Sequence, residues 1–273
     1  MLLSEQGTVV VGDVQLAYDR SGEGDPVVFI CGTGMPRIAW LQHRPIFEQA
    51  GYQTIVFDSR GVGDSDAPPP PYTVEEMTAD TAGLIEQLDL ASCHVIGLSQ
   101  GGMIAEELTR ARPDLVRTAV LMGSAGRESA YARLLSEAEL EVAQTSPLRH
   151  VDTTQTLTMS LSSRELQDDA TVELWAELIG TSDWSGPGRI GQVQANMGWG
   201  ERDHWEESWA AISRPVLVMS FEHDILLPPA AGREAAKHMP HGEFVEIEGV
   251  GHGGAMMKAD EVCRVAMEFF ARH

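Results

Sequence analysis

Val95-Ile96-Gly97-Leu98-Ser99-Gln100-Gly101-Gly102 is an apolar run that breaks into a Gly-x-Ser-x-Gly turn. A turn this tight between a strand and a helix brings the backbone close on both sides of the serine, where a Cβ atom on Gly97 or Gly101 would clash. Apolar residues recur at helical spacing after the turn, which completes the strand–turn–helix order that such a serine requires. The stretch therefore predicts a nucleophile elbow, with Ser99 exposed at the carboxyl end of its strand.

Length and charge limit the kinds of protein that this chain can be. At 273 residues it can form one α/β domain with an insertion and bury a large core. A formal net charge of −22 disfavours nucleic acid or an anionic membrane as partner, because phosphate binding needs clustered Lys and Arg. We interpret the excess of acidic residues as a solvated surface that aids solubility.

Cysteine usage and the N-terminal sequence indicate the same compartment. Cys31, Cys93 and Cys263 are too few and too scattered for a disulfide framework or a zinc site. Residues 1–6 lack the basic and apolar regions of a signal peptide, and no stretch approaches the roughly 18 apolar residues of a membrane span. The sequence thus predicts a cytoplasmic protein with no membrane partner.

The order of the predicted elements divides the chain into three parts. Residues 1–125 open on two short strands around Gly12-Asp13 and then alternate strands with helices. Residues 126–212 are mostly helical and polar, and the alternation resumes over 213–273. The middle part holds five of the six tryptophans, namely Trp175, Trp184, Trp199, Trp205 and Trp209. We predict an α/β fold, a mostly parallel central sheet flanked by helices, with residues 126–212 inserted as a helical lid.

The individual elements follow from apolar periodicity and helix-end signals. Thr73 and Glu76 have the spacing of a capping box at the start of a helix over 73–88. The other predicted helices cover 37–49, 137–144, 169–179, 229–238 and 260–272, and the predicted strands cover 8–11, 14–18, 27–31, 53–57, 93–98, 118–122, 216–221 and 243–248.

Two further residues supply what a serine nucleophile needs. A serine hydroxyl requires a base to take its proton, and His252 lies between glycines directly after the last predicted strand. A neutral imidazole requires an acid to fix its tautomer, and Asp224 follows the strand over 216–221. Glu222, closer to that strand, is the alternative acid. Carboxyl ends of parallel strands share one edge of a sheet, so we expect Ser99, Asp224 and His252 to converge there.

Two backbone groups are candidates for stabilising an oxyanion. The N–H of Gln100 lies at the start of the predicted nucleophile helix, where it has no intrahelical partner. The N–H of Thr33 lies between Gly32 and Gly34, which let the backbone approach a reacting carbon closely. No Gly-x-Gly-x-x-Gly follows a predicted strand and no P-loop is present, so we expect no cofactor. His238 and His241 lack a third ligand, so we expect no metal.

Five motifs are spread along almost the whole chain: Val28-Phe29-Ile30-Cys31-Gly32-Thr33-Gly34, Asp58-Ser59-Arg60-Gly61-Val62-Gly63-Asp64-Ser65, Gly97-Leu98-Ser99-Gln100-Gly101-Gly102, Phe221-Glu222-His223-Asp224 and Gly251-His252. With them the chain resembles the α/β-hydrolase superfamily, nearest to its small esterases, lactonases, perhydrolases and polyketide methylesterases. The resemblance implies Ser99 as nucleophile, Asp224 as acid, His252 as base, and Thr33 and Gln100 as oxyanion donors.

The sequence departs from that family's pattern at two points. Relatives often have His-Gly where this chain has Cys31-Gly32, and the residues Phe221-Glu222-His223 displace a glycine that usually precedes the acid. Neither change removes a catalytic atom. Cys31 is a weak alternative nucleophile, because a cysteine that ends a buried strand is usually an inert small hydrophobe. We expect the glycines and charges of residues 58–65 to hold a turn rather than bind substrate.

Three functional hypotheses remain. The first is a serine hydrolase that cleaves a carboxylic ester or lactone of a small to medium apolar substrate, for example a natural-product intermediate, through an acyl-enzyme. The second uses the same triad for perhydrolysis, elimination, cyclisation or C–C cleavage. The third is a ligand receptor with this fold. A serine rather than an aspartate at the elbow disfavours haloalkane dehalogenase and epoxide hydrolase chemistry, and the sequence discloses neither the substrate nor the oligomeric state.

Overall fold

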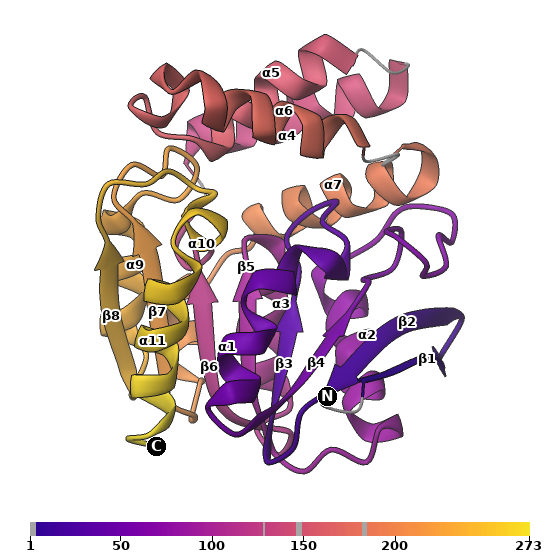
Figure 1. Ribbon diagram of the computed structural model, residues 1–273, viewed down its shortest axis with the longest axis vertical. Helices are drawn as coiled ribbons and strands as arrows, with labels where there is room; N and C mark the ends of the chain where they lie inside the picture. Colours follow the sequence, from indigo (N-terminus) through magenta and orange to yellow (C-terminus); the bar gives the residue numbers. More distant parts are fainter. Residues whose placement is uncertain (1–3, 128, 146–148, 182–184) are drawn as a thin grey trace.

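An eight-stranded sheet forms the centre of the molecule. The computed structural model describes residues 4–127, 129–145, 149–181 and 185–273 (Figure 1). The strand order is β1-β2-β4-β3-β5-β6-β7-β8, in which β2 pairs antiparallel with both β1 and β4 and all other neighbouring pairs are parallel. The strands are β1 Ser4–Val11, β2 Val14–Ser21, β3 Asp25–Ile30, β4 Tyr52–Phe57, β5 Cys93–Leu98, β6 Val116–Met122, β7 Val216–Phe221 and β8 Gly242–Ile247.

Helices cover both faces of the sheet, which explains why its central strands are apolar throughout. Successive side chains of a strand point to opposite faces, and here both faces are buried. One face packs against α2 (Val74–Gln87), α3 (Gln100–Ala111) and α9 (Pro229–His238). The other packs against α1 (Arg44–Gln49), α10 (Gly254–Met257) and α11 (Ala259–Phe270). The predicted fold class, a mostly parallel sheet flanked by helices, is confirmed.

A helical insertion connects β6 to β7. It contains α4 (Ala130–Thr145), α5 (Arg149–Ser160), the 3₁₀ turn η2 (Glu165–Gln167), α6 (Asp169–Thr181), α7 (Gly186–Gly200) and α8 (Trp205–Ala210). In Figure 1, α4, α5 and α6 lie beyond the carboxyl ends of the strands, and α7 lies between them and the sheet. The boundaries of the three parts and the role of residues 126–212 as a lid stay predictions.

The sequence predicted some helix ends well and others poorly. The capping box at α2 is present, because Glu76 N–H donates to Thr73 Oγ1 (3.1 Å) and Thr73 N–H donates to Glu76 Oε2 (2.9 Å). The single helix expected over 37–49 is instead a 3₁₀ helix, η1 (Arg37–Gln42), followed by α1. Pro45 accounts for the break, because proline lacks an N–H and its ring clashes with the carbonyl of the preceding turn. None of the described helices is long and apolar enough to cross a membrane.

The tryptophans of the insertion mostly pack its second half onto the sheet. Trp205 and Trp209 share a face of α8, as their spacing predicts, with ring centroids 5.6 Å apart. Trp199 of α7 meets Trp205 edge-on, and the guanidinium of Arg202 lies over both rings. Trp184 lies outside the described residues. The helices α7 and α8 are therefore fastened to the sheet by aromatic packing.

Candidate active site

The serine elbow depends on two glycines that leave room for the backbone. A Cβ atom on Gly97 would overlap the carbonyl of Gly101, and a Cβ on Gly101 would overlap the carbonyl of Ile30. Ser99 itself has φ +54° and ψ −122°, a conformation that L-residues rarely adopt. Surrounding contacts hold it there, including the bond from Ser99 N–H to the Met122 carbonyl (2.9 Å). The turn presents the serine hydroxyl beyond the end of β5.

Three strand ends bring the predicted serine, histidine and aspartate together. Ser99 follows β5, Asp224 follows β7 and His252 follows β8. The Nε2 atom of His252 lies 3.0 Å from Ser99 Oγ, and its Nδ1 atom lies 2.7 Å from Asp224 Oδ2. Glu222, the alternative acid, is 42% exposed and accepts a hydrogen bond from the N–H of Gly249 instead. The geometry therefore pairs His252 with Asp224.

Asp224, the predicted acid, is buried, and both of its carboxylate oxygens accept hydrogen bonds. The Asp224 side chain has no exposed surface, and its Oδ1 atom accepts the N–H groups of Leu226 (2.8 Å) and Leu227 (2.9 Å). Burial by itself lowers the pKa of His252, but the charge of Asp224 and its hydrogen bond outweigh this effect, so the pKa of His252 is raised. The pair is thus arranged to stabilise an imidazolium.

Gly123, at the end of β6, is a part of the site that the sequence did not reveal. It has φ +50°, and a Cβ atom there would lie 3.2 Å from Asp224 Oδ2 and 3.3 Å from His252 Nδ1. A side chain would therefore press on the acid–base pair. The need for a glycine here comes from Asp224 and His252, which are distant in sequence. The residues next to Gly123 therefore give no indication of it.

The insertion covers the loop that carries His252. The N–H of Gly253 donates to the carbonyl of Ser160, the last residue of α5, at 2.7 Å. The Trp175 ring of α6 packs so closely on Gly253 that a Cβ there would overlap it. These contacts place α5 and α6 beside the base.

Both predicted oxyanion donors have backbone N–H groups available. Gln100 is the first residue of α3, and Gly32 next to Thr33 comes so close to the elbow that its Cβ would lie 3.2 Å from Ser99 Cβ. Among the described residues, the N–H groups of Thr33 and Gln100 have no hydrogen-bond acceptor. Gln192 and Asn196 of α7 contact this loop, and the sequence analysis did not single them out.

The other residues that the sequence singled out make contacts that support the fold. Burial raises the pKa of the Cys31 thiol, and its Sγ faces the carbonyl of Pro36. Asp58 accepts the N–H groups of Arg37 (2.6 Å) and Asp64 (2.9 Å), which ties the turn over residues 58–65. His238 pairs with Glu234 on its own helix, at 3.1 Å.

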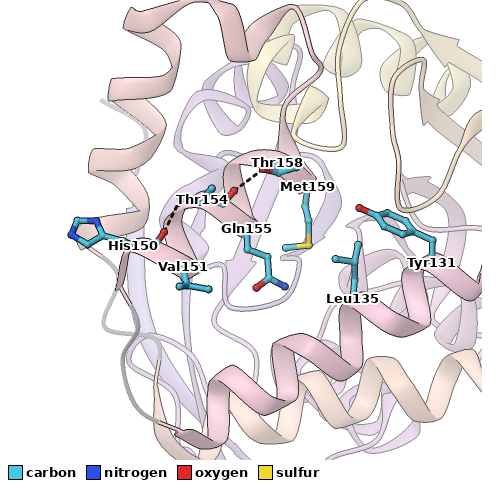
Figure 2. A pocket seen from close by; sticks show the side chains of 8 residues that line it. All are labelled: Tyr131, Leu135, His150, Val151, Thr154, Gln155, Thr158 and Met159. Carbon is cyan, nitrogen blue, oxygen red and sulfur yellow. Dashed lines mark hydrogen bonds between the residues drawn. The ribbon is translucent and has the colours of Figure 1, made fainter.

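An apolar cavity of about 530 Å³, largely open to solvent, lies between α4 and α5 (Figure 2). Figure 2 shows Tyr131 and Leu135 of α4 on one side and Met159 of α5 on the other. The hydroxyls of Thr154 and Thr158 bond to carbonyls one turn back in their own helix, at 2.8 Å each. The threonines therefore satisfy their polar groups within α5 rather than in the cavity.

Comparison with known proteins places the chain in a family. The sequence model described as the alpha/beta hydrolase fold matches residues 25–259. The chain belongs to this alpha/beta hydrolase family. BpoC of Mycobacterium tuberculosis, named as a non-heme bromoperoxidase, is 36% identical over 266 residues, or 94% of this chain and 98% of that protein. Its crystal structure superposes with a TM-score of 0.87, over 94% of this chain and 96% of BpoC.

Two further proteins widen the comparison. The (E)-2-((N-methylformamido)methylene)succinate hydrolase of Acinetobacter baylyi is 26% identical over 86% of both chains. The enol-lactonase of Burkholderia xenovorans has a TM-score of 0.86 at 23% identity, over 97% of this chain and all of that one, a likeness that shows the shared fold. Hydrolase-named relatives support an enzyme.

We expect Gly123→Ala to loosen the pair of Asp224 and His252. The change adds backbone strain of about 1 kcal/mol and a methyl group against both side chains. The rate at which an alkyl fluorophosphonate labels Ser99 should fall at least about tenfold, since small displacements of catalytic groups are costly. The matched control is Gly12→Ala, which has φ +58° and no neighbour within 4 Å of the added methyl. Equal labelling rates for the two variants would contradict this role of Gly123.

Proposed function

We propose that the protein is a serine hydrolase that cleaves a carboxylic ester or lactone through an acyl-enzyme. The observation that carries the proposal is the continuous contact from Ser99 through His252 to Asp224, at 3.0 and 2.7 Å. Nucleophile, base and acid stand within hydrogen-bond reach, which is the arrangement that acyl transfer requires. Membership of the alpha/beta hydrolase family supports the same chemistry.

The proposed reaction proceeds in two halves. The Ser99 Oγ attacks the carbonyl carbon while His252 Nε2 takes its proton, and the N–H groups of Thr33 and Gln100 stabilise the resulting oxyanion. Collapse expels the alcohol, which receives that proton, and leaves the acyl group on Ser99. Water then attacks the acyl carbon with His252 again as base, and His252 passes that proton to Ser99 Oγ as the bond to the acyl group breaks and the carboxylic acid leaves. Asp224 keeps the histidine oriented and stabilises its charged form in both halves.

The cavity between α4 and α5 supports an apolar substrate. Its volume of about 530 Å³ falls within the range of small-molecule sites. None of the described residues that line it belongs to the triad; its link to the site is α5, which ends at Ser160, whose carbonyl accepts the N–H of Gly253 beside His252. We assign this cavity to the apolar part of the ester or lactone, with residues 126–212 acting as its lid.

Perhydrolysis is a second candidate, and the name of the mycobacterial relative favours it. In that reaction hydrogen peroxide replaces water in the second half, so that the acyl group leaves Ser99 as a peracid. The first half and its residues are unchanged. Hydrolysis and perhydrolysis are therefore distinguished only by the product formed when peroxide is supplied.

Intact-mass labelling by an alkyl fluorophosphonate at about pH 8 tests for an activated serine. We expect one adduct on the wild type, no adduct on Ser99→Ala and greatly slowed labelling of His252→Ala. A screen of esters and lactones should then yield carboxylate and alcohol, and a peracid as well if peroxide competes with water. A folded wild-type protein that forms no adduct would overturn the proposal, and an isomerised substrate would favour the non-hydrolytic hypothesis.

The raised pKa of His252 predicts how activity depends on pH. The base must be neutral, so kcat/KM should increase as pH rises through this pKa, which lies above the ordinary value for histidine. Asp224→Asn removes the charge that raises the pKa of His252. The acid limb of the profile should therefore move to lower pH, while kcat falls by about 10⁴. Profiles measured between about pH 5 and 9 test this, and an acid limb that stays in place would contradict it.

Filling the cavity should discriminate between substrates. Leu135→Trp places a large ring in the cavity, so KM for p-nitrophenyl octanoate should rise at least about tenfold while p-nitrophenyl acetate is hydrolysed as before. Leu134→Trp is the matched control, because Leu134 is 62% exposed on the same helix. If both variants hydrolyse both esters like the wild type, the cavity does not hold the substrate.

A further inference from the structure

Asn196 of α7 bridges the two predicted oxyanion donors. Its Nδ2 donates to Thr33 Oγ1 at 2.9 Å, and its Oδ1 accepts from Gln100 Nε2 at 2.7 Å. Thr33 follows β3 and Gln100 follows β5, so one side chain links the two loops whose N–H groups would meet the oxyanion. Each bond joins residues far apart in sequence.

Gln192, one turn earlier on α7, makes a second link. Its Oε1 accepts the N–H of Gly34 at 2.8 Å, and its Nε2 donates to the carbonyl of Arg60 at 2.9 Å. Both partners are backbone groups of fixed polarity, so the orientation of the amide is determined. The carbonyl of Gln192 also accepts from Gln100 Nε2 at 2.8 Å. Gln192 and Gln100 are each 1% exposed, so water does not compete for these bonds.

The loop after β3 needs external anchors because of its glycines. Gly32 and Gly34 flank Thr33, and Gly34 has φ +68°. Residues without a Cβ leave the intervening peptide units free to rotate, which would turn the Thr33 N–H away from the oxyanion. The bonds from Asn196 to Thr33 and from Gly34 to Gln192 restrain the loop at two consecutive residues.

The helix that supplies these anchors is itself seated on the sheet domain. A Cβ on Gly188 would overlap the carbonyl of Gly61, and a Cβ on Gly191 would overlap the ring of Tyr72. Arg60, whose carbonyl Gln192 binds, forms a buried two-point ion pair with Asp80 of α2, at 2.6 and 2.8 Å. α7 therefore has a defined position against the core.

We propose that Gln192 and Asn196 are positioning residues that hold the Thr33 and Gln100 N–H groups for the oxyanion, an inference that rests on the hydrolase function proposed above. The inserted helix α7 is in this sense part of the catalytic frame. The two side chains act through the loops that they bind and do not touch the reacting atoms.

Four variants test this assignment. Asn196→Leu and Gln192→Met keep side-chain volume and remove the bonds, Thr33→Val removes the hydroxyl that Asn196 binds, and Thr33→Ser restores it. Gln194→Met is the control, because Gln194 lies on the same helix and its side chain makes no hydrogen bond within the described residues. Loss of a whole oxyanion donor costs about 10²–10³ in kcat, so loss of one anchor should lower kcat by about tenfold or more with KM within about twofold.

Four readouts separate positioning from mere support of the fold. A boronic acid that forms a tetrahedral adduct on Ser99 should bind more weakly by the same factor as kcat falls. Thr33→Val and Asn196→Leu should be non-additive in combination, because each removes the same bond. Thr33→Ser should recover most of the activity. Hydrogen exchange of the peptide over residues 31–36 should accelerate in Asn196→Leu and Gln192→Met but not in Gln194→Met.

The outcomes distinguish this inference from the proposed function. If the wild type reacts with a fluorophosphonate and hydrolyses esters, but Asn196→Leu and Gln192→Met keep wild-type kcat, boronate affinity and loop exchange, the positioning role is wrong. If these variants lose thermal stability but keep wild-type kcat, the positioning role is also wrong. A wild type that neither labels nor turns over overturns the hydrolase, while faster exchange in the variants would still support the anchoring of the loop.

Discussion

The crossing of α3 over β5 is the contact on which the rest of the site depends. Gly97 and Gly101 bring helix and strand so close that neither residue has room for a Cβ, and Gly101 also lies against the carbonyl of Ile30 at the end of β3. One crossing therefore fixes the strained Ser99, the free N–H at the start of α3 and the origin of the loop that carries Thr33. The proposed nucleophile and the proposed donor Gln100 therefore share a single rigid support.

Burial strengthens the electrostatic interaction between Asp224 and His252, and it limits the size of the residues next to them. Asp224 has no exposed surface and satisfies its carboxylate with two backbone N–H groups and His252, so its charge acts on the histidine without screening by solvent. The same enclosure demands small neighbours. Gly123 lies beneath the pair, and Gly251 and Gly253 lie against α5 and α6. These three glycines thus serve close packing more than flexibility.

The features that depend on neighbouring residues were predictable from the sequence. The elbow, the capping box at Thr73 and the strand-end positions of Asp224 and His252 each follow from neighbouring residues, and the fold class followed from their order. Gln192 and Asn196 were not predictable in this way. Gln192 binds residues 34 and 60, Asn196 binds residues 33 and 100, and all four partners are more than ninety positions away. The break before α1 was readable from Pro45, and was missed because the apolar spacing of residues 37–49 continues across it.

The insertion contributes to the site in two physically different ways. α7 is tied to the core by backbone contact at Gly61, by the ring of Tyr72 and by buried amide bonds, so a change in its position would disturb the oxyanion loop. α4 and α5 instead flank an open apolar pocket, and large apolar side chains such as Leu134 and Val151 are exposed on these helices. Apolar walls tolerate changes of shape better than hydrogen-bonded networks do. The walls formed by α4 and α5 can therefore vary in sequence more freely than α7, whose buried amide bonds hold the loop after β3.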